Sequence, residues 1–259
     1  MDLGISGRTA IVCASSKGLG KACAMALARE GARVIINGRD PARLKAAAAE
    51  INQATGRTVQ AVAADLNTAE GRDRLAAAAP DADILINNNA GPPPGTLADW
   101  DHAAWLAAVE ANMLAPILLI RALIPGMRQR KFGRIVNITS AMVKSPRPAM
   151  ALSTAARAGL TAFSKSLSLE VAADNVVINN LLPERFDTDR QKQMAERIMA
   201  AKGVSLAEAR EEIVQTLAAK RFGDPAEFGD ACAFLCGANA GFISGQNLQL
   251  DGGSYAGLI

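Results

Sequence analysis

Glycines near the start of the chain are spaced so that they could bind a phosphate. The segment 13–20 follows the apolar run Thr9–Val12 and leads into the alanine-rich segment 21–30. A strand, a glycine-bearing turn and a helix in this order present backbone N–H groups and a helix N-terminus to a ligand. Gly18 and Gly20 have no Cβ, so the backbone can approach that ligand closely. The pattern predicts a phosphate site, although an ordinary strand-to-helix loop has the same spacing.

Two cations indicate which nucleotide would fit this site. Gly38 and Arg39 follow the second apolar run, where a site specific for NAD usually has an acid for the ribose 2′-OH. Lys17 on the facing turn and Arg39 could together clamp a 2′-phosphate. The alternative is that Arg39 is a solvated neighbour of Asp40. We expect NADP(H) rather than NAD(H).

Short apolar segments alternate with alanine-rich helical segments along the whole chain. The expected strands are 9–13, 33–36, 58–63, 83–86, 134–138, 176–181 and 246–250. This alternation predicts an α/β fold, a doubly wound (Rossmann) parallel sheet of about seven strands with helices on both faces. We expect residues 1–259 to form one such domain, whose ligands bind beyond the carboxyl ends of the strands.

Three helix starts can be recognised within this alternation, and two irregular stretches interrupt it. Asp40 before Pro41 is an N-cap, and Ser205 and Asp224 each begin a capping box. The stretch 87–95 is rich in asparagine and proline. The stretch 183–220 is longer than a plain crossover, so we expect it to form a substrate lid. The alternative is a surface helical hairpin without function.

Composition excludes several classes of protein. Half of the 259 residues are hydrophobic, 20% are charged and the net charge is +3, which is too small to indicate nucleic-acid binding. Residues 1–4 lack the cationic head of a signal peptide. The apolar run 113–120 is far shorter than the roughly 18 residues that span a membrane. We therefore expect a soluble cytoplasmic protein with no membrane segment.

Metal and hydrolase chemistry are poorly supplied with side chains. The chain has four cysteines, which we expect to be reduced and structural, and a single histidine, His102. One histidine gives little support for a zinc site, so no metal is expected. A Ser-His-Asp hydrolase would have to use His102, which lies at an expected helix start.

The chain resembles the short-chain dehydrogenase/reductase family over almost its whole length. The first turn is similar to the family's T-G-x-x-x-G-x-G, with Cys13 and Ala14 in place of the threonine and first glycine. The family's N-N-A-G is matched either by 88–91 after a one-residue insertion or by 87–90 without a gap. Further matches are Asp65-Leu66, Asn112, the strand ending in Ser140, the Asn179–Glu184 segment resembling N-x-x-x-P-G, and 250–253 with its closing D-G-G.

The resemblance implies a function and a set of site residues. It implies hydride transfer between NADP(H) and a small carbonyl or alcohol substrate in a homodimer or homotetramer, with the 3-oxoacyl-carrier-protein reductase branch as the nearest in appearance. The implied catalytic residues are Asn112, Ser140, Ser153 and Arg157. The implied cofactor-binding residues are Ser16, Lys17, Gly18, Leu19, Gly20, Arg39, Asp65, Leu66, Asn88, Ala90, Arg157, Pro183 and Thr188.

The family's catalytic tyrosine and lysine are absent from their expected places. Ser153 takes the tyrosine position and Arg157 the lysine position, and the i, i+4 spacing keeps both on one helix face. A hydroxyl is a far weaker acid than a phenol, and a guanidinium does not give up its proton. Another donor could replace the tyrosine: water held by Ser140 and Ser153, Lys144, or Tyr255, which is the only tyrosine. The alternatives are non-redox chemistry, or NADP(H) binding without turnover as a sensor or assembly subunit.

Overall fold

The computed structural model describes residues 2–258 and contains one parallel sheet. Its strands are β1 (Thr9–Val12), β2 (Arg33–Gly38), β3 (Gln60–Ala63), β4 (Ile84–Asn87), β5 (Gly133–Ile138), β6 (Val176–Pro183) and β7 (Asn247–Leu250). They lie in the order β3-β2-β1-β4-β5-β6-β7, and every pair is parallel. The switch in strand order between β1 and β4 is where such sheets bind ligands.

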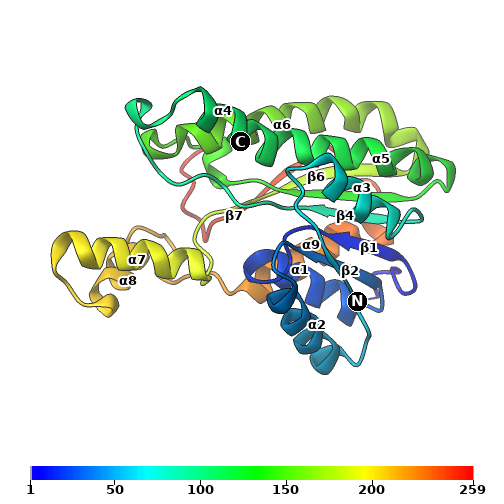
Figure 1. Ribbon diagram of the computed structural model, residues 1–259, viewed down its shortest axis with the longest axis horizontal. Helices are drawn as coiled ribbons and strands as arrows, with labels where there is room; N and C mark the ends of the chain where they lie inside the picture. The colour runs from blue at the N-terminus through cyan, green and yellow to red at the C-terminus, as the bar shows by residue number, and fades with distance from the viewer. Residues whose placement is uncertain (1, 259) are drawn as a thin grey trace.

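Helices cover both faces of the sheet (Figure 1). On one face lie α1 (Gly18–Arg29), α2 (Pro41–Thr55) and α9 (Pro225–Cys236). On the other lie α3 (Ala69–Ala77), α4 (His102–Val109), α5 (Ala115–Gln129) and α6 (Ala151–Val171). Each face encloses its own cluster of buried aliphatic side chains, because strands buried on both sides need apolar residues at every position.

The predicted fold class is confirmed, and the predicted strands are correct to within a few residues at their ends. The helix starts are confirmed as well. Asp40 accepts hydrogen bonds from the backbone of Ala42 and Arg43, and Ser205 and Asp224 form capping boxes with Glu208 and Glu227. These signals are local side chain-to-backbone contacts, which is why the sequence alone reveals them.

One long helix joins α4 to α5 through a π-helical turn at Glu110–Leu114. The combined helix His102–Gln129 is long and apolar enough, by length and composition, to cross a membrane. The short apolar run 113–120 did not predict such a helix. Further apolar residues lie on either side of the run, separated by polar ones, and they belong to the same helix. Leu119, Leu123 and Met127 are buried against the sheet, so much of the apolar character serves the protein core.

The predicted excursion forms a helical hairpin that projects from the sheet (Figure 1). It consists of α7 (Asp189–Lys202) and α8 (Leu206–Gln215), with a small core of its own around Ala195, Ala209 and Ile213. A β-bridge between Phe186 and Gly223 joins the segment that enters the hairpin to the segment that leaves it. The α7–α8 hairpin is therefore held to the body of the protein at a narrow base.

A row of asparagines crosses four strands at one level of the sheet. Asn87 donates to Asn137 at 2.9 Å, Asn137 donates to Asn180 at 3.0 Å, and Asn180 donates to Asn247 at 2.8 Å. The four residues stand in register on β4, β5, β6 and β7. A buried amide must find partners, so this ladder fixes the strands where the apolar part of the sheet ends.

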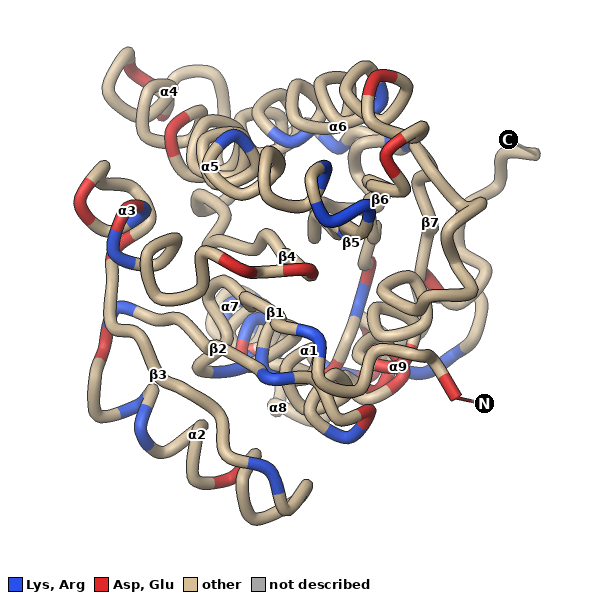
Figure 2. The backbone as a smooth tube through the Cα atoms, turned by 90° about the vertical axis from the view of Figure 1, so that its right-hand side faces the viewer, with Lys and Arg blue, Asp and Glu red and all other residues tan. Residues whose placement is uncertain are grey.

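Figure 2 shows basic and acidic positions interspersed along the backbone, for example on α2 and α3 and around α9. Neither sign collects on a face of its own in this view. This distribution agrees with the small net charge of +3.

Candidate active site

The glycine turn leaves the N-terminus of α1 open. Lys17 is the N-cap residue, and its side chain makes no capping hydrogen bond. Gly18 has φ +57°, a left-handed conformation that favours glycine. A Cβ on Gly20 would lie 2.5 Å from the carbonyl oxygen of Ala14, so only glycine fits there. The turn thus offers unpaired helix N–H groups to an anion, as its spacing predicts.

Ala14 occupies the place of the family's first glycine and adopts a conformation typical of glycine. Its φ is +44°. Its N–H donates to Oδ1 of Asn37 at 3.3 Å, and its carbonyl accepts from Nδ2 of Asn88 at 3.3 Å. Side chains from the ends of β2 and β4 therefore hold the turn in a shape that alanine adopts only at a cost.

The end of β2 lies directly against the glycine turn. A Cβ on Gly38 would lie 3.3 Å from Oγ of Ser16, so the two residues are close neighbours. Arg39 is exposed, and Asp40 caps α2 rather than binding Arg39. Lys17 binds Asp189 of α7 through an ion pair of 3.1 Å. The two predicted cations are thus at the surface, and Lys17 has an acidic partner on the α7–α8 hairpin.

The segment after β3 forms a tight turn. Oδ1 of Asp65 accepts from the backbone N–H of Asn67, and Leu66 is buried. Thr68 is the N-cap of α3 and accepts from the N–H of Gly71. Thr68, and not Asp65, therefore caps α3. The second carboxylate oxygen of Asp65 has no hydrogen-bond partner among the described residues, which leaves it available to a ligand.

The asparagine-rich turn after β4 connects the glycine turn to the π-helical turn. Asn87 ends the strand, and Asn88 binds Ala14 as described. Asn89 donates to the carbonyl of Ala111 at 3.2 Å, and Nδ2 of Asn112 donates to the carbonyl of Ala90 at 3.3 Å. Oδ1 of Asn112 is buried and has no partner in the described chain, which marks a place for a water or a ligand.

Ser153 and Arg157 lie on α6 beyond the carboxyl end of β5, beside the segment that leads to Ser140. Ser140 follows that strand, and its Oγ accepts from the N–H of Met142 at 3.2 Å. Ser153 and Arg157 lie one turn apart on α6, and Oγ of Ser153 accepts from Nε of Arg157 at 3.3 Å. A Cβ on Gly91 would lie 3.4 Å from both Oγ of Ser153 and Nη2 of Arg157. The asparagine-rich turn therefore passes directly over this pair.

The guanidinium of Arg157 ties three backbone carbonyls together. Nη1 donates to the carbonyls of Ile138 at 2.8 Å and Thr139 at 3.1 Å, and Nη2 donates to that of Asn89 at 3.4 Å. Burial, and then the nearby charge of Arg190, lowers the pKa of Arg157 to about 10. The group is still protonated at neutral pH, so it is a fixed positive charge at the end of the sheet.

Pro183 and Thr188 lie on the path from β6 to α7. Pro183 pairs with Leu250, and Thr188 is the N-cap residue of α7. Cγ2 of Thr188 is 3.8 Å from where a Cβ of Gly18 would be. The start of α7 thus reaches the glycine turn. A hollow of about 490 Å³ lies beside this contact and is lined in part by Lys17, Gly18 and Thr188.

Lys144 and Tyr255, two of the predicted alternative proton donors, lie next to each other. The Lys144 ammonium is 5.4 Å from the centre of the Tyr255 ring. The backbone N–H of Tyr255 donates to Asp251, which follows the end of β7. The C-terminal segment therefore returns to the loop that begins at Ser140.

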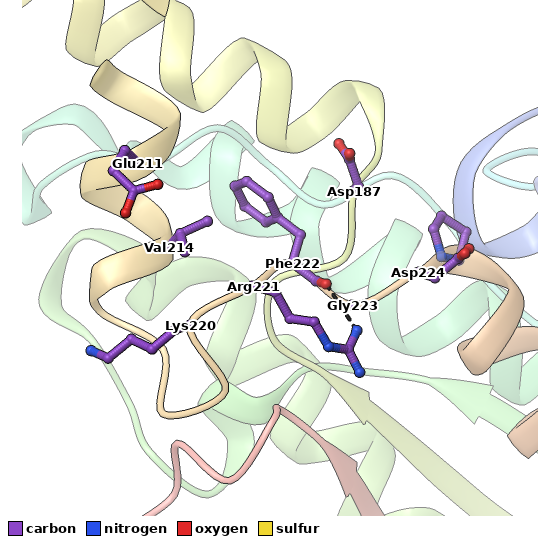
Figure 3. A pocket seen from close by; sticks show the side chains of 9 residues that line it. Asp187, Glu211, Val214, Lys220, Arg221, Phe222, Gly223 and Asp224 are labelled. Atoms are coloured by element: carbon purple, nitrogen blue, oxygen red, sulfur yellow. Dashed lines mark hydrogen bonds between the residues drawn. The ribbon is translucent and has the colours of Figure 1, made fainter. Parts of the chain in front are cut away.

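A further hollow of about 560 Å³ lies at the root of the α7–α8 hairpin (Figure 3). Its charged residues have protein partners. Arg221 binds Glu227, Arg210 binds Asp187, and Lys220 donates to a backbone carbonyl. This hollow holds none of the predicted catalytic residues.

The cysteines form no metal site. All four are buried and free, and no group of three or more potential ligands occurs among residues 2–258. Burial raises the pKa of Cys13 to about 12 and also raises that of Cys236 well above its usual value. The expectation of reduced, structural cysteines agrees with this arrangement.

Residues 8–198 match the model of the short chain dehydrogenase family. The chain belongs to this family. The match spans the glycine turn, the asparagine-rich turn, Ser140 and the Ser153–Arg157 pair, and the predicted resemblance is confirmed.

Curated relatives align over nearly their whole length. The NADPH-dependent reductase BacG of Bacillus subtilis is 31% identical to this chain, and the alignment covers 96% of this chain and 98% of the relative. A 3-oxoacyl-acyl-carrier-protein reductase of Vibrio cholerae is 30% identical, with coverage of 98% and 99%. A crystal structure of L-sorbose reductase from Gluconobacter frateurii with NADPH and L-sorbose superposes with a TM-score of 0.95, at 31% identity and with full coverage of both chains.

Two supporting elements were not predicted from the sequence. Asn37 holds the glycine turn, and the asparagine ladder fixes β4 to β7. The signal was present, since Asn37, Asn87 and Asn137 lie at or near the carboxyl ends of their strands, Asn180 lies within β6 and Asn247 begins β7. Aligning the expected strands by these asparagines could have shown that the residues share one level.

Proposed function

We propose that this protein is an NADP(H)-dependent oxidoreductase that transfers a hydride between the nicotinamide and a carbonyl or alcohol carbon. One arrangement supports the proposal most. The open N-terminus of α1 and the group of Ser140, Ser153 and Arg157 lie along the same carboxyl edge of the sheet. The helix α1 follows β1 at the switch point, and Ser140 follows β5, which is the neighbour of β4. The NADPH-dependent relatives support the choice of cofactor.

The residues at this edge fit a dinucleotide with a 2′-phosphate. The glycine turn from Ser16 through Leu19 would hold the pyrophosphate. Lys17 and Arg39 would hold the 2′-phosphate. Arg39 would suffice if Lys17 keeps its ion pair with Asp189. Asp65 and Leu66 would contact the adenine. The remaining residues proposed to hold the nicotinamide half are Asn88, Ala90, Arg157, Pro183 and Thr188. When bound, the cofactor supplies or accepts the hydride.

The two serines are set to donate hydrogen bonds to a substrate oxygen. Oγ of Ser140 already accepts from Met142, and Oγ of Ser153 accepts from Arg157. The structure shows no protein acceptor for the O–H of either serine among the described residues. Both protons are therefore free for a carbonyl oxygen. The fixed charge of Arg157 would stabilise the negative charge that develops on that oxygen. Asn112 would position the turn above the pair.

The proton itself would come from a group other than a tyrosine on α6. Water held by the two serines is the simplest source, because serine hydroxyls exchange protons with water. Lys144 and Tyr255 are further candidates on the loop side. A positioned acid contributes about 10²–10⁴-fold, so we expect slow turnover unless one of these groups is well placed.

The proposal is tested by binding and turnover together. NADPH and NADH are titrated while the fluorescence of Trp100 and Trp105, two rings packed edge to face, is followed. NADPH absorbance is then followed across a substrate panel, as a loss when NADPH is mixed with ketones and aldehydes and as a gain when NADP+ is mixed with alcohols. Tighter binding of NADH than of NADPH would contradict the choice of cofactor. Turnover of any panel member with NADPH or NADP+ supports the oxidoreductase.

The presence of Ser153 and Arg157 in place of the family's tyrosine and lysine favours a second function. The protein would bind NADP(H) without turnover, as a sensor or assembly subunit. Tight NADPH binding with no activity across the panel would support this alternative.

We also propose that the protein assembles as a homodimer or homotetramer. Only 39% of the most apolar stretch of the helix His102–Gln129 is buried within one chain. Leu106 on α4 and Leu169 on α6 are 57% and 74% exposed. A second copy would cover this apolar surface. Light scattering coupled to size-exclusion chromatography measures the mass, and Leu106→Asp with Leu169→Asp should lower it towards the monomer.

A further inference from the structure

Most arginines around the α7–α8 hairpin have acidic partners. Arg147 binds Glu184 at 2.8 Å, and Arg185 lies 3.4 Å from the same carboxylate. Arg210 binds Asp187 at 2.9 Å, and Arg221 binds Glu227 at 2.7 Å. Four arginines around the hairpin therefore have acidic partners, and two of them share Glu184.

Arg157 and Arg190 depart from this pattern. Within residues 2–258 neither forms an ion pair, and their hydrogen-bond acceptors are neutral. Arg157 comes from α6 and donates to the carbonyl of Asn89 at 3.4 Å, while Arg190 comes from the first turn of α7 and lies 3.5 Å from the carbonyl of Pro92. The two guanidinium groups therefore approach one short segment, residues 89–92, from two different helices.

The position of this pair costs electrostatic free energy. The charge of Arg190 is close enough to disfavour the charged form of Arg157. Arg190 also lies in the first turn of α7, where the helix dipole disfavours a cation. An anion between the two groups would offset both effects.

Donors are available for such an anion. Arg157 has five N–H groups, and four are used by Ser153 and three carbonyls. One N–H of Nη2 is left. Arg190 has a single contact at the outer limit of a hydrogen bond and is exposed, so most of its donors are free. Guanidinium groups bind planar oxyanions through paired N–H donors.

We propose that Arg157 and Arg190 bind an anionic oxygen group, and that this group is a carboxylate on the substrate beside its reacting carbonyl. The inference rests on the proposed oxidoreductase function and narrows its substrate class to oxo acids or hydroxy acids. The other source of the same chemistry is a phosphate of the cofactor. The open N-terminus of α1 and Arg39 already provide for phosphates, whereas Arg157 is hydrogen-bonded to Ser153.

The test compares oxo acids with their methyl esters. Pyruvate, acetoacetate and 2-oxoglutarate are assayed beside the esters in the wild type and in Arg190→Gln. Lys192→Gln is the matched control, since Lys192 is an exposed cation on the same helix and forms no ion pair within residues 2–258. We expect the wild type to prefer at least one acid over its ester. In Arg190→Gln the ratio of kcat/KM for acid over ester should fall about tenfold or more, whereas the control should keep the wild-type ratio.

Binding measurements separate the two sources and do not depend on turnover. Each oxo acid is titrated calorimetrically into the protein, and NADPH is titrated by tryptophan fluorescence. The proposal is supported if Arg190→Gln binds the oxo acid more weakly than the wild type does and binds NADPH with an unchanged Kd. A Kd for NADPH that rises tenfold, with equal losses for acid and ester, would assign the pair to a cofactor phosphate and overturn it. The proposal is also overturned if the wild type prefers no acid over its ester. If the wild type does not bind NADPH, the proposed oxidoreductase function itself is wrong.

Discussion

Nε of Arg157 donates a hydrogen bond of 3.3 Å to Oγ of Ser153, one turn earlier on α6. The bond leaves the hydroxyl proton of Ser153 available, because an oxygen that accepts from the arginine has its O–H free for another group. Ser153 is 7% exposed and lies beneath the asparagine-rich turn. The pair therefore orients an oxygen acceptor well but supplies no acid of suitable pKa.

Restoring a phenol and an ammonium at these two positions should increase carbonyl reduction. In the double variant Ser153→Tyr with Arg157→Lys, a positioned acid would raise kcat/KM by about 10²–10⁴-fold. NADPH oxidation with a ketone that the wild type reduces measures the effect. Arg157→Lys alone is the control and should not reproduce the rise, since position 153 still lacks the phenol. An unchanged rate in a double variant that still binds NADPH would show that position 153 does not face the substrate.

Arg39 should contribute specifically to NADPH binding. Removing its charge in Arg39→Ala deprives a 2′-phosphate of a charge-assisted hydrogen bond, so the Kd for NADPH should rise about 10- to 100-fold. The Kd for NADH, which lacks that phosphate, should change little. Arg43→Ala removes an exposed charge from the first turn of α2, four residues after Arg39, and should leave both constants near the wild-type values. Equal losses for the two cofactors would mean that Arg39 does not read the 2′ position.

Asn137 should be the most costly member of the asparagine ladder to replace. It accepts from Asn87 and donates to Asn180 and Ser164, and it is fully buried. In Asn137→Leu these partners lose their hydrogen bonds inside the core, so the free energy of unfolding should fall by about 3 kcal/mol. Urea denaturation measures it. Ile135→Val on the same strand changes only packing and should cost about 1 kcal/mol.

The buried thiols should be unreactive in the native protein. Burial raises the pKa of Cys13 to about 12, and the pKa values of Cys232 and Cys236 are also raised. Ellman's reagent at neutral pH should therefore label none of the three before unfolding and all of them in denaturant, because the thiolate is the reactive form.

The same shifts give a pH dependence of stability. A thiol with a raised folded-state pKa is protonated when folded but ionises near its ordinary pKa of 9.0 when unfolded. Its contribution to stability is complete below about pH 9 and decreases as the pH rises above that value. Urea midpoints should therefore be lower at alkaline pH, and Cys13→Ala should reduce this slope. A midpoint independent of pH in this range would contradict the assignment.

Much of this protein could be predicted from its sequence because the signals are local. Apolar strands and helix caps such as Asp40 and Asp224 depend on nearby residues, and the i, i+4 spacing of Ser153 and Arg157 places them on one helix face whatever surrounds them. The glycine turn is also local, since Gly18 needs a left-handed backbone and Gly20 a close approach within the same turn. The missing tyrosine and lysine were visible for the same reason.

Tertiary structure decided which side chains have partners. Nothing in the sequence pairs Lys17 with Asp189, which is 172 residues further along the chain, or brings Lys144 to Tyr255. The ladder of Asn87, Asn137, Asn180 and Asn247 exists only because parallel pairing puts these residues in register. Charge pairing is likewise settled in space, because an ion pair acts over a few ångströms and not along the chain. That is why Arg157 and Arg190 are recognised as charges without acidic partners only when the sheet and the α7–α8 hairpin are in place.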